Sequence, residues 1–407
     1  MDEQTDDPER KFRRWPRARA RWSTTTLWRR VRMGARRRRW IRENIEAVAP
    51  YKKAVTPIAG GPALALGDFS GASGLSRAAL YELDRLRSEW PDLETIDLAA
   101  TRSAGPALVK QSGHDFGTVL LLSPPDSYPT LLRAVPPSRI ANARRIGLWV
   151  WETPIFPEDW RFALDVVHEI WTPSEYSRSA LAEAAGDIPV TLRAHAVKPP
   201  PRVAPFDRSA FGIGEDDFLG VAIMDLCSCP ARKNPWAHVA AWQAAFGDDP
   251  SRVLLMKLRV SKRTRCVIDE LREMIGAAHN IRILEHEFEP EEIAGLQAAA
   301  DVYLSLHRAE GYGLNIRESL EAGVEVLATD FSANAEYGPA FPNYRPLPWR
   351  PTPYRDWTGH YPDGDFTWAE VQIGAAAEEL RTSAARWKER RTHPAPGSPM
   401  SAAAVRR

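Results

Sequence analysis

The sequence predicts an α/β protein with two doubly wound, Rossmann-like domains that face each other across a cleft. Three observations support this fold class. The chain has 407 residues, more than a single hydrophobic core usually serves. Short apolar runs alternate with helical segments, which is typical of parallel sheets covered by helices on both faces. The proline-rich segment "VKPPPRVAPFDRSAFGI" divides this alternation into two sets near residue 200.

The first set occupies residues 46–200. Its opening segment, "GGPALALGDFSGASGLSRAALYELDRL", predicts a strand, a glycine-rich turn and a helix that begins near Leu75. Further strands are expected in "FGTVLLLSP", "ARRIGLWVWETP" and "HEIWTPS", with helices in "RFALDVV" and "SRSALAEAA".

The second set occupies residues 201–345. We expect strands in "FLGVAIMDL", "RVLLMKL", "IRILEHEF", "VYLSLH" and "EVLATD", and helices in "PWAHVAAWQAAF", "RCVIDELREMIGAA", "PEEIAGLQAAA" and "LNIRESLEAG". Residues 346–392 end in one more helix, and we expect this segment to pack back toward the N-terminal domain. Residues 393–407 are expected to be disordered.

Residues 1–45 form a basic arm. The formal net charge of the chain is +1, yet residues 10–42 hold 15 Lys or Arg and no acid, which leaves 39 basic against 53 acidic residues elsewhere. The first interpretation of this arm is a solvated, disordered tail or an extension translated from an upstream start codon. The second is a membrane-surface segment, because four tryptophans lie among these arginines, and nucleic acid is the least favoured partner.

The compartment predicted from the sequence is the cytoplasm, with peripheral attachment to the inner face of the membrane through the arm as an option. The chain has no apolar run of about 20 residues and no apolar signal core after its first charges. Its three cysteines, Cys227, Cys229 and Cys266, suit a reducing compartment and are interpreted as thiols that bind no metal.

The segment "RAEGYGLNIRESLEAG" places two carboxylates around a glycine turn between a strand and a helix. Gly311 and Gly313 lie where the free N–H groups and the positive end of the helix dipole would face an anion such as phosphate. Glu310 precedes these amides and Glu318 follows them inside the helix, so the two carboxylates should contact different parts of one ligand. A carboxylate can accept hydrogen bonds from a vicinal diol, and a nucleotide sugar offers two diols joined by a diphosphate.

Four separated motifs resemble the retaining GT-B glycosyltransferases of glycosyltransferase family 4. They are "LGDFSGASGLSRAA", "IGLWVWETPIFPEDW" with "VHEIWTPSEYSRSAL", "CPARKNPWAHVAAWQAAF" and "SLHRAEGYGLNIRESLEAGVEVLATDFSANAEY", and they cover roughly residues 60 to 385 in the order of the family. The resemblance implies a GT-B fold, a nucleotide-sugar donor and a glycan or lipid-linked acceptor. It implies no cofactor and no metal.

Carried over residue by residue, the resemblance implies that Glu310 contacts the donor sugar near its anomeric carbon and that Glu318 holds the ribose. Lys233, with Arg232 beside it, would neutralise the leaving diphosphate, where negative charge develops. Further expected donor contacts are Gly311, Tyr312, Gly313, Leu314, Lys257, Gly71, Ser73, Gly74, Ser332 and Asn334.

The chain also departs from the family pattern. Glu152, after Trp151, stands where many relatives carry a histidine, and it is a candidate sugar or acceptor contact together with His307. Asp225 stands where many relatives carry a base. The pair Asp363 and Asp365 follows no hydrophobic strand, so it is interpreted as a surface turn and not as a metal site.

The function implied is that of a retaining hexosyltransferase in surface polysaccharide biosynthesis, with mannose from GDP-mannose as the favoured donor. Two alternatives stay open. One is a non-catalytic GT-B scaffold that binds glycan or a partner glycosyltransferase, which is disfavoured because Glu310 and Lys233 are both present. The other is a GT-B epimerase, for which only Glu152 is an evident catalytic group in the N-terminal domain.

Overall fold

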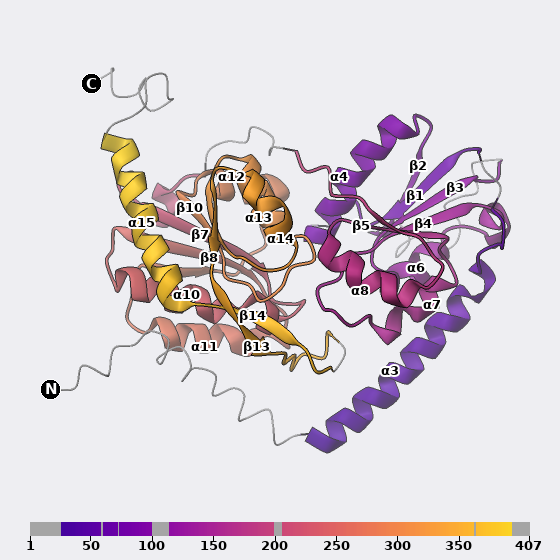
Figure 1. Cartoon of the computed structure of the whole chain (residues 1–407), viewed down its shortest axis with the longest axis horizontal. Helices are drawn as coiled ribbons and strands as arrows, with labels where there is room; N and C mark the ends of the chain where they lie inside the picture. The colour runs from indigo at the N-terminus through magenta and orange to yellow at the C-terminus, as the bar shows by residue number, and fades with distance from the viewer. Residues whose placement is uncertain are drawn as a thin grey trace.

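The computed structural model describes residues 26–57, 60–71, 73–99, 114–198, 206–361 and 364–392, with backbone alone for residues 26–35. Residues 199–205 of the proline-rich linker, Asp363 and the expected tail at 393–407 lie outside these ranges. The described chain forms two α/β domains side by side, each built on a six-stranded sheet (Figure 1).

The N-terminal domain contains a parallel sheet with the order β2-β1-β3-β4-β5-β6. Its strands are β1 (Ala63–Gly67), β2 (Glu94–Asp97), β3 (Thr118–Leu122), β4 (Arg144–Leu148), β5 (Glu169–Thr172) and β6 (Val190–Leu192). Its helices include α4 (Gly74–Glu89), α6 (Tyr128–Leu132), α7 (Arg161–Leu164) and α8 (Glu175–Ala185). The strand order changes direction beside β1, which places the loop after β1 at the switch point where such sheets bind ligands.

The C-terminal domain contains a second parallel sheet with the order β12-β11-β10-β7-β8-β9. Its strands are β7 (Phe218–Asp225), β8 (Arg252–Arg259), β9 (Ile281–Leu284), β10 (Val302–Ser305), β11 (Glu325–Thr329) and β12 (Tyr344–Leu347). Between them lie α9 (Pro230–Lys233), α10 (Pro235–Phe246), α11 (Arg265–Ile275), α12 (Pro290–Ala298), α13 (Leu314–Glu321) and α14 (Ala333–Tyr337). The switch point of this sheet lies between β7 and β10.

Most of the strands that the sequence predicts are central ones, with β9 at a sheet edge the exception, and burial explains why. All five residues of β1 and of β11 are buried, and so are the first seven of β7. Central strands of a parallel sheet have helices on both faces, so they appear in sequence as continuous apolar runs. The expectation of two doubly wound domains is confirmed.

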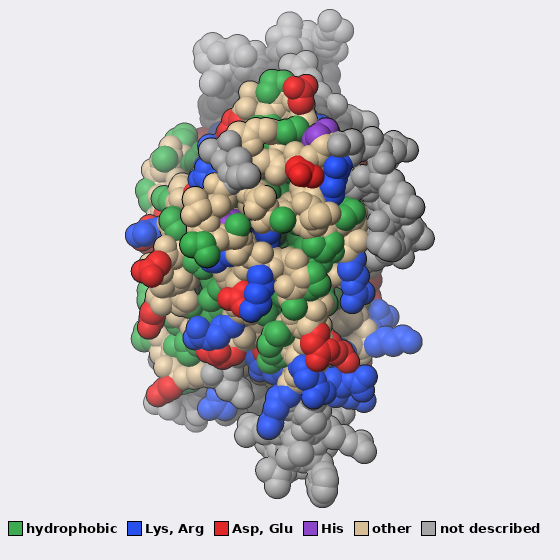
Figure 2. Space-filling view, turned by 90° about the vertical axis from the view of Figure 1, so that its right-hand side faces the viewer, with side chains coloured by type: hydrophobic (Ala, Val, Ile, Leu, Met, Phe, Trp, Pro, Cys, Tyr) green, Lys and Arg blue, Asp and Glu red, His purple; other side chains and the backbone are tan. Residues whose placement is uncertain are grey.

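The second half of the expected arm is helical in the structure. Helix α3 (Thr26–Val48) lies along the N-terminal domain and contacts α6 and α7. Trp40 packs edge-on against Phe162 at 6.3 Å, and Arg37 pairs with Asp159 at 2.7 Å. Figure 2 shows Lys and Arg side chains gathered at the lower part of the face that lies on the right of Figure 1. The exposed arginines of α3 are Arg36, Arg37, Arg38, Arg39 and Arg42.

The C-terminal segment divides between the two domains. Strands β13 (Trp349–Pro353) and β14 (Thr367–Val371) form an antiparallel hairpin, and Tyr361 and Trp368 belong to the same apolar cluster as Trp151 and Trp160 of the N-terminal domain. Helix α15 (Ile373–Thr392) packs instead on α10 of the C-terminal domain. The segment therefore contacts the N-terminal domain through its hairpin, whereas its helix packs on the C-terminal domain.

Candidate active site

The candidate site lies at the carboxyl ends of β7 and β10, at the switch point of the C-terminal sheet. The chain leaves β7 into α9, which ends in Arg232 and Lys233. It leaves β10 into the loop that carries Glu310 and the glycine turn before α13. The carboxyl ends of neighbouring parallel strands meet at one edge of a sheet, so two segments about 77 residues apart converge here.

Glu310 is held between two cations. Its Oε2 lies 2.9 Å from Arg232 Nη1, and its Oε1 lies 2.5 Å from Lys233 Nζ. Arg232 is 2% exposed and Glu310 is 8% exposed. Burial would raise the pKa of Glu310, but Arg232 and Lys233 outweigh it and lower that pKa to about 2. The carboxylate is therefore fully ionised at neutral pH. It can stabilise a positive charge, but it holds no proton to donate.

The turn after Glu310 brings the backbone of the C-terminal domain against the N-terminal domain. A Cβ at Gly311 would lie 2.4 Å from Val150 Cγ1, so only glycine fits there. Gly313 has φ +78° and begins α13, which leaves the amides of the first turn free of helical partners. Leu314 is the first residue of that helix, and Tyr312 is buried against Tyr337, with 5.2 Å between ring centroids.

Glu318 lies inside α13 and faces the N-terminal domain. Arg77 of α4 donates from Nε and Nη2 to its two carboxylate oxygens, each at 3.0 Å. Tyr81, one turn further along α4, donates from its hydroxyl at 3.1 Å. The two glutamates of the motif therefore have separate partners within the protein.

Lys257 lies near the end of β8, the strand next to β7, and is 8% exposed. Burial lowers its pKa, with Arg259 and Arg77 acting in the same direction against Asp225 and Glu287. Within the described ranges it has neither a hydrogen bond nor an ion pair; its ammonium lies 5.9 Å from the centre of the Phe288 ring. A buried ammonium that forms no ion pair can bind a further anion.

The glycine-rich loop after β1 leads into α4. Gly71 donates its backbone N–H to Asp68 Oδ1 at 3.1 Å, and a Cβ on Gly71 would collide with Asp68. Ser73 caps α4 by accepting the N–H of Ser76 at 3.1 Å. Gly74 has open space around the position of a Cβ. Gly71 and Ser73 thus form hydrogen bonds within the protein. Of the three residues, Gly74 is the one with free space beside its backbone.

Ser332 and Asn334, two further predicted contacts, support the loop of Glu310. Ser332 has φ +68°, which is uncommon for a residue other than glycine, and its hydroxyl accepts the backbone N–H of Glu310 at 2.8 Å. Asn334 is fully buried, and its Nδ2 donates to the carbonyl of Thr329 at 2.8 Å. The Asn334 side chain is therefore anchored by the protein through its Nδ2, and a ligand contact at this residue stays a prediction.

Glu152 and His307 differ in access. Glu152 approaches Arg232 to 3.5 Å from the N-terminal side, and its carboxylate is partly exposed. His307 is 1% exposed, and burial lowers its pKa. Its Nδ1 lies 3.0 Å from the carbonyl of Ser305, and its Nε2 lies 3.4 Å from that of Phe331. His307 thus lies beneath the site, whereas Glu152 faces it from the opposite domain.

The sequence did not predict the polar network below Glu310. Glu370 of β14 accepts hydrogen bonds from Arg308 Nε and Nη2 at 3.1 and 2.6 Å, and from Asn234 Nδ2 at 2.9 Å. His238 of α10 accepts the backbone N–H of Leu306 on Nε2, and burial lowers its pKa to about 4. These side chains fix the strand end from which Glu310 projects.

No group of three or more His, Cys, Asp or Glu side chains within the described ranges is arranged to hold a metal ion. No described helix is long and apolar enough to cross a membrane.

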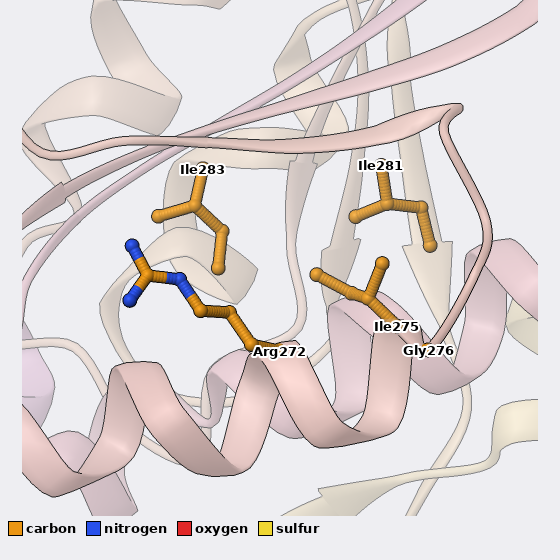
Figure 3. Close-up of a pocket in the computed structure, with 5 residues that line it drawn as sticks. All are labelled: Arg272, Ile275, Gly276, Ile281 and Ile283. Carbon is orange, nitrogen blue, oxygen red and sulfur yellow. The ribbon is translucent and has the colours of Figure 1, made fainter.

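A surface pocket of about 240 Å³ lies between α11 and β9, lined by Arg272, Ile275, Gly276, Ile281 and Ile283 (Figure 3). It adjoins the start of β9, at the end of the sheet opposite to Glu310, and contains none of the predicted site residues.

Comparisons with known proteins identify the architecture. No protein-family model and no curated protein matches the sequence. HepE of Anabaena, solved with UDP and glucose, superimposes with a TM-score of 0.51 at 14% identity, over 81% of this chain and 95% of that chain. The chain has the GT-B fold. OtsA and a glycosyltransferase from Rickettsia africae each give a TM-score of 0.50, at 8% and 12% identity. They are matched over 81% and 79% of this chain and over 94% and 87% of their own.

The GT-B fold brings the predicted residues together in two groups. The first contains Glu310, Arg232, Lys233 and Glu152, which meet between the domains. The second contains Glu318, which is joined there by Arg77 and Tyr81. The charge of Arg77 also acts on Lys257, where it adds to the lowering of the lysine pKa by burial. Arg77 was missed, although it lies only three residues after Gly74 in a quoted motif and is the cation nearest to the glycine loop.

Proposed function

We propose that this chain is a retaining glycosyltransferase that moves a hexose from a nucleotide sugar to a glycan or lipid-linked saccharide in surface polysaccharide biosynthesis. One observation carries the proposal: a fully ionised Glu310 is held by Arg232 and Lys233 at the switch point of a GT-B domain, opposite Glu152 of the other domain. The GT-B fold, shared with HepE in complex with UDP and glucose, supports it.

In this mechanism the bond between the anomeric carbon and the donor diphosphate breaks, and its electron pair leaves with the diphosphate. Lys233 and Lys257 neutralise the negative charge of the leaving group, while Glu310 stabilises the positive charge on the sugar. An acceptor hydroxyl attacks the same face and passes its proton to the departing oxygen, which retains the configuration. Glu318 holds the ribose, and no metal or cofactor is required by these residues.

The donor can be tested directly. We expect a nucleoside diphosphate or a nucleotide sugar to raise the melting temperature of the protein. GDP-mannose is the donor favoured by the sequence, and UDP-glucose is the donor suggested by HepE. Lys233→Ala should weaken diphosphate binding at least tenfold, because it removes a cation at the leaving group. Calorimetric titration with UDP, GDP and their sugars measures this effect.

Lys262→Ala is the matched control for this titration, because Lys262 is an exposed lysine in the turn before α11. It should bind nucleotides as the wild type does. If none of the four nucleotides binds the wild type, the proposed function is wrong. Binding without any turnover toward saccharide acceptors would favour the scaffold alternative.

The arm adds a membrane surface as a proposed partner. The exposed arginines of α3 lie together on the side of the N-terminal domain, so an anionic bilayer would be attracted at about 1 kcal/mol per charge. The variant Arg36→Gln/Arg38→Gln/Arg42→Gln avoids Arg37 and Arg39, which form ion pairs. We expect it to float with vesicles of phosphatidylglycerol several-fold less than the wild type at low salt. Equal recovery of both proteins would contradict a membrane role for these arginines.

A further inference from the structure

Arg77 makes an ion pair across the two domains inside the proposed donor site. It lies in the first turn of α4, and its backbone N–H donates to the carbonyl of Ser73 at 3.0 Å. Its guanidinium and the Glu318 carboxylate form the bidentate pair described above. The Arg77 side chain is 13% exposed and that of Glu318 is 5% exposed. The pair is thus largely shielded from water, so each partner depends on the other.

In the free protein, the hydrogen-bond acceptors of the Glu318 carboxylate are already occupied by protein donors. Besides Arg77, Tyr81 donates to Oε1 at 3.1 Å, and Gln297 Nε2 lies 3.5 Å from Oε2. Arg77 Nη2 is shared with Asn315 Oδ1 at 2.5 Å. A ribose diol needs the same two carboxylate oxygens. The carboxylate has about four acceptor positions, and the two bonds from Arg77, the bond from Tyr81 and the contact from Gln297 fill them, so a diol can bind Glu318 only by displacing donors. We expect Arg77 to give way, because it donates to both oxygens from the other domain.

An Arg77 released in this way leaves a second cation in the region where its charge already acts on Lys257. Lys257 is buried and forms no ion pair within the described residues; burial lowers its pKa, Asp225 and Glu287 oppose this, and Arg259 and Arg77 add to it. A released guanidinium beside this buried ammonium is unfavourable unless an anion joins them. A diphosphate carries that charge, and the planar guanidinium matches its oxygens in a bidentate geometry.

We propose that Arg77 is an exchange residue for the donor, which holds Glu318 in the free protein and moves to the diphosphate with Lys257 when ribose takes Glu318. This inference rests on the proposed function and deepens it. It explains how the site selects a nucleoside diphosphate over a nucleoside: both offer the ribose, but only the diphosphate compensates the charge that ribose binding releases. Arg77 is in this sense a specificity residue for the diphosphate.

Arg77→Gln separates the two halves of this exchange. The variant loses the competitor for Glu318 and also the cation for the diphosphate. We expect the nucleoside, uridine or guanosine, to bind the variant as tightly as the wild type or up to several-fold more tightly. We expect the matching UDP or GDP to bind at least tenfold more weakly. The ratio of diphosphate to nucleoside affinity should therefore fall at least tenfold, as measured by calorimetry on the full chain.

Two further variants control the measurement. Arg85→Gln removes an exposed arginine of the same helix that pairs with Glu89, and it should leave both affinities unchanged. Arg77→Lys keeps the charge without the bidentate geometry, and it should give an intermediate ratio. Circular dichroism and melting temperature report whether Arg77→Gln is folded; if it is not, the ratio for Arg77→Lys alone decides, and a wild-type value there overturns the proposal.

The remaining outcomes are distinct. If both affinities of Arg77→Gln rise by the same factor, Arg77 is only a competitor of ribose and its role at the diphosphate is refuted. If both are unchanged, or both fall together, the exchange is refuted altogether. If the wild type binds UDP or GDP but the ratio is constant, this inference fails and the proposed function stands. If the wild type binds no nucleotide, both fail.

Discussion

Replacing Glu310 by glutamine is expected to lower the rate of nucleotide release from the donor by roughly 100- to 1,000-fold, as measured in initial-rate assays with the donor that binds. Glutamine keeps the shape of the side chain but removes the negative charge next to the anomeric carbon. Because Lys233 would then lose its ion-pair partner and buried Arg232 would keep only Glu152 at 3.5 Å, the free protein should also be destabilised by about 3–5 kcal/mol. Diphosphate binding should persist, since it supplies that charge.

Glu321→Gln is the matched control, because Glu321 also lies on α13 but pairs only with Arg317 one turn away. Its rate should equal that of the wild type. The pKa of Glu310, lowered from 4.5 to about 2, adds a second readout. Its ion pairs stabilise the fold fully above pH 4.5 and lose that effect as the pH falls toward 2, so acid should destabilise the wild type more than Glu310→Gln. A rate for Glu310→Gln within threefold of wild type would refute the role of this carboxylate.

Replacing Glu370 by alanine is expected to lower the free energy of unfolding by about 3–5 kcal/mol at pH 7. Arg308 and Glu370 are each 7% exposed, and Arg308 also donates to the carbonyl of Ala231 at 2.6 Å. Without Glu370 the guanidinium stays buried with one backbone acceptor. Urea denaturation measures the loss, and donor affinity should fall with it, because Arg308 lies two residues before Glu310.

The double variant Arg308→Met/Glu370→Leu is the control for this pair. It removes both charges and keeps the volume, so it should recover most of the stability lost in Glu370→Ala. Recovery of stability without recovery of donor affinity would indicate that Arg308 also positions the loop of Glu310. A loss below about 1 kcal/mol in Glu370→Ala would show that Arg308 finds another partner.

The sequence predicts the central strands of both sheets well, because burial on two faces makes them continuously apolar. It misses β2 and β6, which lie at the edges of the N-terminal sheet and contain exposed or partly exposed residues. It misses the hairpin of β13 and β14, where prolines in β13 obscure the strand pattern. The arginine-rich composition of α3 resembles a solvated tail, and the helix is identified only through its contacts with α6 and α7.

The sequence predicts those parts of the candidate site that depend on short stretches of chain and on the strand topology. A glycine turn between a strand and a helix places Glu310 and the amides of α13, and parallel topology brings Lys233 to the same edge. The Arg77 and Glu318 pair was not predictable, because it depends on how closely the two domains approach. The pair of Arg308 and Glu370 was missed for another reason: Glu370 lies beyond residue 345, where no periodic pattern marks its strand.

The contacts between the domains have two unlike sides. On one side, Tyr361 and Trp368 pack with Trp151 in a continuous apolar cluster, with 5.2 Å between the rings of Tyr361 and Trp151. On the other, the Arg77 and Glu318 pair joins the domains through polar atoms that can form hydrogen bonds with water or a ligand once the domains separate. Separation of the apolar side exposes aromatic surface, whereas separation of the polar side does not. We therefore expect that rotation between the domains costs the least free energy when the hinge axis passes through the aromatic side, because the aromatic contacts then stay buried.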